Sequence, residues 1–306
     1  MTTLVILKPF RPILMIALFA FLAGCSMPRL GYQNIDHLIR WKINDYVSLN
    51  RQQSRLFKSE IKAQHAWHCH LDLPRYRPLL ISAREALLND ALKAKDIHMH
   101  AGHWKDEFER TLLRATPGAV DILRTLDSDQ IEELFTQLSR AHNELYERYV
   151  APDEQEQINE RSERMRKRLE RWLGRLDQDQ TQRIERWAIQ PADRNALWLE
   201  NRQHWQQAFR QTLAERDRPH FPDELARLLM QPQSLWLPRY RDQQTLITEA
   251  TIDMILEVMA IANPQQKEHL GRTLDDLLKD LERVRCPRLP ENEPPLAMAD
   301  SNLSSV

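Results

Sequence analysis

Apolar residues recur at the spacing of an α-helix along almost the whole chain, and this pattern decides the class of fold. One such stripe consists of Ile158, Met165, Leu169, Trp172, Leu173 and Leu176. Residues three and four apart share one helix face, so each stripe predicts an amphipathic helix. Strand signals are scarce, since alternating apolar and polar runs are few and only six glycines occur in 306 residues. The sequence therefore predicts an all-α fold: an elongated, mostly antiparallel bundle of long helices.

Proline-containing segments predict where these helices end. We expect breaks at Leu73-Pro74 and Pro78, Pro117-Gly118, Pro152, Pro191, Pro219 to Pro222, Pro232, Pro238 and Asn263-Pro264. The expected helices cover roughly 35–47, 51–70, 78–97, 104–114, 118–125, 128–149, 153–174, 178–189, 194–215, 222–230, 239–261 and 264–284. We place the helical domain at 34–286, as one bundle or two, and a disordered tail at 287–306.

The first 24 residues have the features of an export signal. Lys8 and Arg11 precede an apolar run that is short for a transmembrane helix, and the run ends in Leu22-Ala23-Gly24-Cys25. This is a lipobox, in which small residues before the cysteine admit signal peptidase and the thiol receives a diacylglyceryl group. We therefore expect Cys25 to be the lipidated first residue of the mature chain, followed by a tether over 25–33.

The residue after the cysteine bears on the destination. By the sorting rules of bacterial lipoproteins, Ser26 in place of Asp sends the protein to the outer membrane, where it would face the periplasm. The mature chain retains 41 basic and 44 acidic residues, with both signs interspersed along its length. That distribution argues against a nucleic-acid-binding face. The membrane, through the lipid, is the expected partner.

Two cysteines remain after lipidation, Cys69 and Cys286. The periplasm is oxidising, so a disulfide between them is allowed and would join the start of the helical domain to its end. Two free thiols are the alternative, because the sequence does not supply the geometry.

Four segments between helical stripes share one pattern: an apolar or small residue, Asp or Asn, two variable residues and Gln. The pairs are Asn50 with Gln53, Asp127 with Gln130, Asp177 with Gln180, and Asn263 with Gln266. This spacing predicts a capping box, in which the Asx side chain accepts from the N–H three residues on and the Gln side chain accepts from the N–H of the cap residue. The pattern also resembles the Leu-Thr-x-x-Gln motif of the Spy and CpxP family of helical periplasmic chaperones, with Asp or Asn in place of Thr.

Over most of its length the chain resembles an uncharacterised family of proteobacterial lipoproteins recorded as a domain of unknown function. The residues that carry this resemblance are the lipobox with Tyr32, Trp67, Leu73 to Tyr76, Arg168 to Leu176, and Leu197-Trp198 with Trp205. The resemblance implies a lipid-anchored protein with a helical domain and no known activity.

Histidines crowd around Cys69. His65, His68 and Cys69 share a helix face and His70 is adjacent, which is the arrangement that a Zn or Cu site would use. Many enzyme classes have short catalytic sequence motifs. The sequence contains no nucleophile elbow, no phosphate-binding glycine loop and no zinc-protease motif. The sequence therefore favours a non-enzymatic scaffold or chaperone-like protein without a cofactor, which binds unfolded or envelope proteins; a periplasmic metal-binding protein is the alternative.

Overall fold

The computed structural model describes residues 31–89, 91–189 and 193–289, and these residues form a helical bundle without strands. The all-α prediction is confirmed. The elements are α3 (Ile35–Ile43), α4 (Arg51–Trp67), the π-helical turn η1 (His68–Asp72), α5 (Leu73–Leu88), α6 (Ala94–Arg124), α7 (Ser128–Tyr149), α8 (Glu154–Leu173), α9 (Gln178–Ala188), α10 (Arg194–Ala214), α11 (Phe221–Met230), the 3-10 turn η2 (Pro232–Leu235), α12 (Pro238–Ala260) and α13 (Pro264–Glu282).

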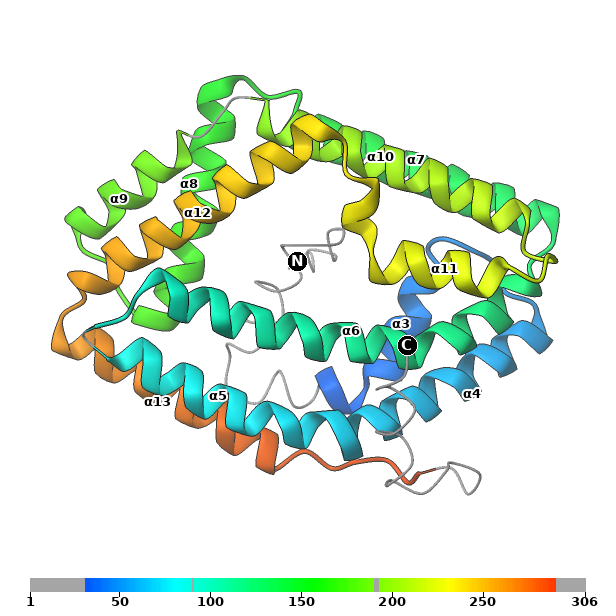
Figure 1. The fold of residues 1–306 in the computed structure, drawn as a ribbon, viewed down its shortest axis with the longest axis horizontal. Coiled ribbons are helices and arrows are strands. Elements are labelled where there is room, and N and C mark those ends of the chain that lie inside the picture. The colour runs from blue at the N-terminus through cyan, green and yellow to red at the C-terminus, as the bar shows by residue number, and fades with distance from the viewer. Residues whose placement is uncertain (1–30, 90, 190–192, 290–306) are drawn as a thin grey trace, which may run out of the picture.

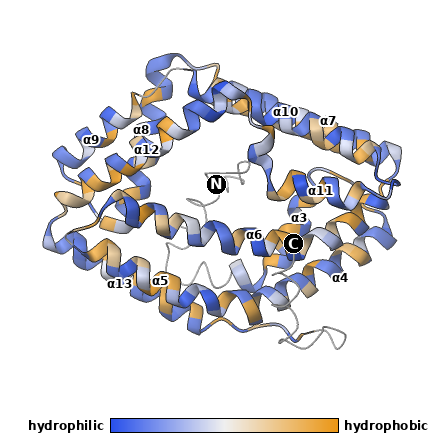
Figure 2. Cartoon of the chain, in the orientation of Figure 1, coloured by the Kyte–Doolittle hydropathy of each residue, from blue (hydrophilic) through white to orange (hydrophobic). Residues whose placement is uncertain are grey.

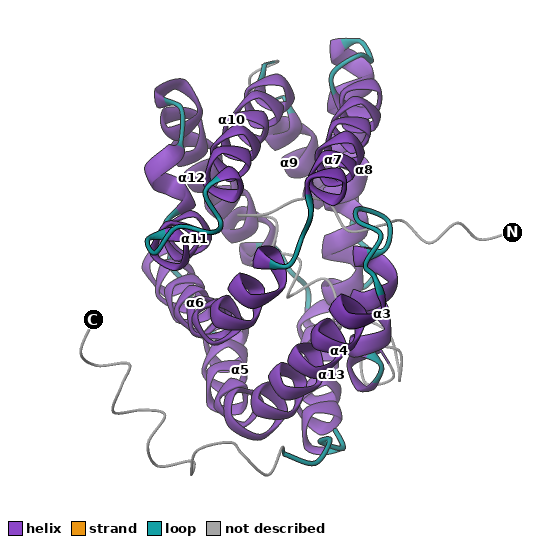
Figure 3. Cartoon of the chain, turned by 90° about the vertical axis from the view of Figure 1, so that its right-hand side faces the viewer, coloured by secondary structure: helices purple, strands orange, loops and turns teal. Residues whose placement is uncertain are grey.

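The helices follow one another around a closed ring (Figure 1). Helix α5 packs on α13, α13 on α8, α8 on α9, α9 on α12, α12 on α10, α10 on α11, α11 on α6, and α6 again on α5. Helix α7 lies along α10, and α4 lies along α6. Short loops join the helices (Figure 3). The ring brings segments from opposite ends of the sequence, such as α5 and α13, side by side.

Three clusters of buried apolar side chains hold this ring at separate places. The largest joins α8, α9, α12 and α13 and contains Met165, Ile184, Val258 and Leu274. A second joins α6, α7, α10 and α11, and a third joins α5, α6 and α13. Hydrophilic residues line every helix between the apolar ones (Figure 2). Each helix thus buries an apolar stripe against its neighbours, as amphipathic spacing dictates.

The predicted breaks at Pro74 and Pro78 are wrong, because α4, η1 and α5 run on without interruption. In η1 the N–H of Leu73 donates to the carbonyl of His68, five residues back. This π turn shifts the hydrogen-bond register immediately before Pro74, which has no N–H to give and whose ring crowds the preceding turn. The chain instead leaves the helix after Leu88, so the helix expected over 78–97 ends early and α6 begins at Ala94.

The break expected at Pro117-Gly118 is also wrong. Helix α6 continues through it to Arg124, so the two helices expected over 104–114 and 118–125 are one. An interior proline costs about 3 kcal/mol, and packing offsets that cost here, since Val120 belongs to the second apolar cluster. Gly118 leaves room for the Glu60 side chain of α4, whose carboxylate would meet a Cβ atom at 2.6 Å. The glycine serves close packing of two helices.

Several sequence predictions fall outside the described residues. These are the export signal over 1–24, Cys25, most of the tether and most of the tail beyond Pro287. Within the described residues, no helix has both the length and the apolar character needed to cross a membrane.

All four predicted capping boxes form, and their glutamines do more than cap. The side chain of Gln53 bonds reciprocally to that of Gln130, with N···O distances of 2.8 and 2.7 Å, and Gln180 bonds in the same way to Gln266, at 3.0 and 2.8 Å. Each amide also donates to a backbone carbonyl across the junction, as Gln53 does to Thr125 at 2.7 Å and Gln266 to Arg175 at 2.8 Å. Both hydrogens and both lone pairs of every amide are therefore used.

The two amide pairs fasten four helix starts into two junctions. One joins the starts of α4 and α7, and the other joins the starts of α9 and α13. Gln180 is fully buried, and the other three glutamines are at most 8% exposed. Removing one glutamine of a pair would leave the other amide unsatisfied, which lowers the free energy of unfolding by about 1–3 kcal/mol for each unsatisfied group. Each pair is therefore stable only when both glutamines are present.

We predict that Gln180→Glu lowers the free energy of unfolding by roughly 2–5 kcal/mol. Glutamate can still accept from the Asp177 N–H, so the capping box survives. As a carboxylate it cannot donate to Gln266 or to the Val258 carbonyl, and it places a charge at a position with no exposure to solvent. Urea unfolding followed by circular dichroism measures the change.

Gln182→Glu on the exposed side of the same helix is the matched control and is expected to change stability by less than about 0.5 kcal/mol. Equal unfolding midpoints for the two variants would show that the amide pair does not hold the junction.

Candidate functional site

The residues singled out around Cys69 meet in one place, where η1 joins α4 to α5. Cys69 forms a disulfide with Cys286, and the two Cα atoms lie 5.5 Å apart. The bond joins η1 to the segment that follows α13. Helix α13 itself packs along α5. His70 donates from Nε2 to the carbonyl of Pro287 at 3.0 Å, beside the same bond. The end of the helical domain is thus fixed to its beginning, across 217 residues.

His68 links two tyrosines from different parts of the chain. Its Nδ1 lies 2.8 Å from the hydroxyl of Tyr32, and its Nε2 lies 2.8 Å from the hydroxyl of Tyr76. A neutral imidazole donates with one nitrogen and accepts with the other, so one hydroxyl accepts and the other donates. Tyr32 also meets the edge of the His65 ring, with centroids 4.9 Å apart. The segment before α3 is therefore held against the domain by a hydrogen-bonded clamp.

Burial sets the protonation states of this clamp. Removal from water lowers the pKa of His68 to about 4, with a smaller effect in the same direction from His65. Burial also raises the pKa of the Tyr32 and Tyr76 hydroxyls, with Asp72 adding to both shifts. At neutral pH the imidazole is uncharged and both phenols keep their protons. These states suit a fixed hydrogen-bond chain.

Two ion pairs lie directly behind the clamp. Asp72 is fully buried and accepts from Arg110 Nε at 2.9 Å and from the Thr111 hydroxyl at 3.0 Å. Glu107 accepts two bonds from Arg75, of 2.9 and 2.7 Å. Burial raises the pKa of Asp72 and the bonds from Arg110 and Thr111 oppose that rise. Each carboxylate has its own guanidinium, so the network is balanced in charge.

Three of the four predicted metal ligands are engaged elsewhere. Cys69 is in the disulfide, both nitrogens of His68 face tyrosine hydroxyls, and His70 bonds to a carbonyl. His65 is buried, its Nε2 makes no hydrogen bond, and burial lowers its pKa. In the part of the chain that the structure describes, no group of three or more His, Cys, Asp or Glu side chains is placed to hold a metal ion.

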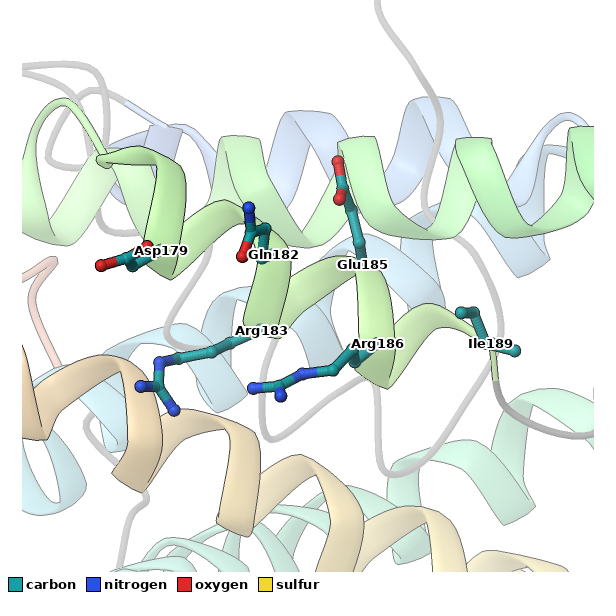
Figure 4. A pocket seen from close by; sticks show the side chains of 6 residues that line it. All are labelled: Asp179, Gln182, Arg183, Glu185, Arg186 and Ile189. Carbon is teal, nitrogen blue, oxygen red and sulfur yellow. The ribbon is translucent and has the colours of Figure 1, made fainter.

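A separate pocket of about 530 Å³ lies on the outer face of α9 (Figure 4). Its lining residues are Asp179, Gln182, Arg183, Glu185, Arg186 and Ile189. Arg183 and Arg186 both pair with Glu257 of α12, at 2.9 and 3.2 Å. Both cations in this pocket thus share one carboxylate of the neighbouring helix, and the pocket brings together no group of unusual reactivity.

The sequence found His68 and Cys69 but not the partners that define their roles. Tyr76 could have been suspected, because Leu-Pro-Arg-Tyr-Arg occurs at both 73–77 and 237–241, and both tyrosines are buried. Asp72 and Glu107 gave no local signal, since acidic residues are common along all these helices. What the arrangement can do chemically is hold the N-terminal segment and respond to acid.

A family model describes residues 45–241, which is more than half of the chain and runs from the end of α3 into α12. It is the model of DUF6279, a family of unknown function. The chain belongs to this family. The DUF6279 region contains the Gln53–Gln130 junction and the clamp residues His68 and Tyr76, whereas Gln266 and Cys286 lie beyond it. Neither the curated proteins nor the solved structures include a significant match.

We predict that Cys286→Ser lowers the free energy of unfolding by roughly 2–5 kcal/mol, because the bond restricts a long loop in the unfolded chain. Wild-type protein unfolded in urea with and without reductant measures the effect, and the reduced wild type should match the variant. Intact mass gives the control: an oxidised chain is lighter by two hydrogens. A wild-type midpoint that reductant leaves unchanged would contradict the prediction.

We predict that acid weakens the fold between pH 6.5 and about 4 in part through His68. Over this window the His68 imidazole is protonated in the unfolded chain but stays neutral in the folded one. The free energy of unfolding therefore decreases as the pH is lowered, by at most about 1.4 kcal/mol per pH unit for one group. Asp72, whose pKa is raised, acts in the opposite sense. His68→Gln should therefore show a shallower fall than the wild type.

Urea midpoints measured at a series of pH values test this slope. The variant loses stability at every pH through its altered hydrogen bonds, so only the difference in slope is diagnostic. Parallel curves for the two proteins would place the acid sensitivity in other groups.

Proposed function

We propose that the protein is a lipid-anchored, periplasm-facing lipoprotein of the outer membrane that acts as a non-enzymatic binding scaffold, with a chaperone-like role in the cell envelope. The observation that carries this proposal is the clamp on Tyr32. Seven peptide units separate Tyr32 from Cys25, and each spans at most about 3.6 Å, so the clamped Tyr32 can lie no farther than roughly 25 Å from a lipidated Cys25. A rigid domain would sit close to the membrane surface.

The build of the domain supports a binding role. Two buried amide junctions, a disulfide and three apolar clusters fix the frame. Large apolar side chains are nevertheless exposed along it, including Leu38 and Trp41 on α3, Met99 on α6 and Tyr146 on α7. Such side chains offer contacts to the apolar segments of unfolded proteins. The capping-box spacing, similar to that of Spy and CpxP, agrees with this role.

We predict that Cys25→Ala moves the protein from the membrane fraction to the soluble periplasmic fraction, because the thiol that receives the lipid is lost. Immunoblots of fractionated cells measure the distribution. Ser26→Ala, which leaves the cysteine in place, is the control and should stay in the membrane fraction. Equal membrane association of Cys25→Ala and wild type would remove the anchoring part of the proposal.

The chaperone-like part needs its own measurement. The purified protein should slow light scattering by lysozyme as it aggregates after reduction, and Trp41→Ser should slow it less, whereas Gln182→Ser on exposed polar surface should act like the wild type. Because the reductant used on lysozyme also threatens the Cys69–Cys286 bond, reduced lysozyme is prepared and freed of reductant beforehand. Equal light scattering of lysozyme with and without the protein would contradict the chaperone-like part of the proposal and retain only the scaffold.

A further inference from the structure

Helix α3 has apolar side chains on two of its faces. Ile35, Ile39 and Ile43 repeat every fourth residue and are partly buried, and the helix packs on α4. Leu38 and Trp41, three residues apart, lie on a different face and are 45% and 52% exposed. A helix that rests on a protein surface normally has one apolar stripe, which it buries. The second face, which we call the outer face of α3, instead meets solvent.

Trp41 is the tryptophan that the fold leaves most open to water. All eight tryptophans of the chain lie in the described residues, and each of the others is buried or partly buried. Trp187 and Trp205, for example, donate their indole N–H groups to Thr251 and to the Leu228 carbonyl. An indole combines an apolar body with one polar N–H, and for this reason tryptophan concentrates where hydrocarbon meets water at a membrane surface.

The segment before α3 would bring the outer face to the bilayer. The Asn34 N–H donates to the Gly31 carbonyl at 3.2 Å and the Leu38 N–H to the Asn34 carbonyl at 3.1 Å, so helical turns connect the clamped Tyr32 to α3. Leu38 is six residues beyond Tyr32, which is about 9 Å at the rise of an α-helix. Seven peptide units between Tyr32 and Cys25 are enough for this face to reach the surface that holds the lipid and too few for it to move far away.

A short tether also strengthens a weak contact. Two apolar side chains would hold a free protein on a membrane only briefly. A short flexible linker raises the effective concentration of the second contact to roughly millimolar, so the same two side chains can stay in place once the lipid is inserted.

The charges around the outer face do not oppose an anionic surface. Between residues 34 and 46 the acidic residues are Asp36 and Asp45. The Asp36 side chain is only 13% exposed, and Asp45 pairs with Lys42 at 2.9 Å. Arg40 adds a cation in the last turn of the helix. Basic residues beside Trp and Leu are typical of helices that lie in the headgroup region of a membrane.

We propose that the outer face of α3 docks on the phospholipid surface in which the lipid on Cys25 is anchored. The inference rests on the proposed anchoring and adds to it the part of the domain that meets the membrane. Leu38 and Trp41 enter the headgroup region, and exposed apolar side chains on other helices, such as Met99 and Tyr146, remain available to proteins of the periplasm. The domain is then held in one orientation instead of turning about its tether.

Spin labelling of the mature lipidated chain in vesicles tests the docking. The chain has three cysteines, so with Cys25 lipidated and the Cys69–Cys286 bond closed, Leu38→Cys supplies a single thiol for a nitroxide. The vesicles contain phosphatidylethanolamine and phosphatidylglycerol. Electron paramagnetic resonance measures collisions of the label with oxygen, which concentrates in hydrocarbon, and with a nickel chelate, which stays in water.

The matched control is Leu246→Cys with the same label. Leu246 is 66% exposed on α12, which lies apart from α3 in both Figure 1 and Figure 3. We expect the ratio of oxygen to nickel collisions to be several-fold higher for the label at position 38 than for the label at position 246.

A second substitution in the Leu38→Cys background separates the outer face from the label itself. Trp41→Ser should shift the collision ratio toward that of a label in water, because the larger apolar side chain of the face is lost. Met99→Ser, at an exposed position on α6, is the matched control and should leave the ratio unchanged. Both positions are exposed, and circular dichroism verifies that both variants fold. A ratio that Trp41→Ser leaves unchanged would contradict the docking.

The outcomes distinguish the docking from the anchoring. Equal collision ratios at positions 38 and 246, on a chain that floats with the vesicles, would overturn the docking and leave the anchor intact. Dipolar broadening between labels at position 38 would show that a second copy covers this face, and would also overturn it. Intact mass shows whether Cys25 carries the lipid, and a chain without it would contradict the proposed anchoring together with this inference.

Discussion

The reciprocal amide bonds between buried glutamines are the constraint on which the ring depends. A cap alone fixes the start of one helix, with a contribution of about 1 kcal/mol. Here the residue at the third helical position is a glutamine. Its side-chain amide also donates to, and accepts from, the amide of the glutamine in another capping box. Glutamate would serve the first purpose and fail the second, which explains why all four positions carry the amide. Helix starts that are far apart in sequence are thereby joined in specific pairs.

The apolar clusters and the disulfide act within the frame that these junctions set. Packing between amphipathic helices is tolerant of small rotations and shifts, because many side-chain arrangements fill a similar volume. Two buried, fully satisfied amide pairs are less tolerant, since any displacement leaves donors unpaired. Apolar burial thus supplies most of the stability, and the buried amide pairs specify which helices meet and in what register.

The local parts of this structure were readable from the sequence, and the distant parts were not. The capping boxes were predicted because all their atoms lie within four residues, but the amide pairs join residues 77 and 86 apart and left no local sign. Pro74 and Pro117 misled us for the same reason: proline disfavours a helix locally, and a π turn or packing against a neighbouring helix overrides it. At the candidate site, the sequence showed the cluster of histidines. It did not show that His68 bonds to Tyr32 and Tyr76, which come from other parts of the chain.

The disulfide has a further consequence for how the molecule withstands damage. Cys69 and Cys286 lie near the two ends of the helical domain, and the chain between them forms one covalent circuit. A single backbone cut at any point between these cysteines leaves the two fragments covalently joined. In a compartment that contains proteases, the domain can therefore be nicked without being divided, and only a second cut or a reductant sets a piece free.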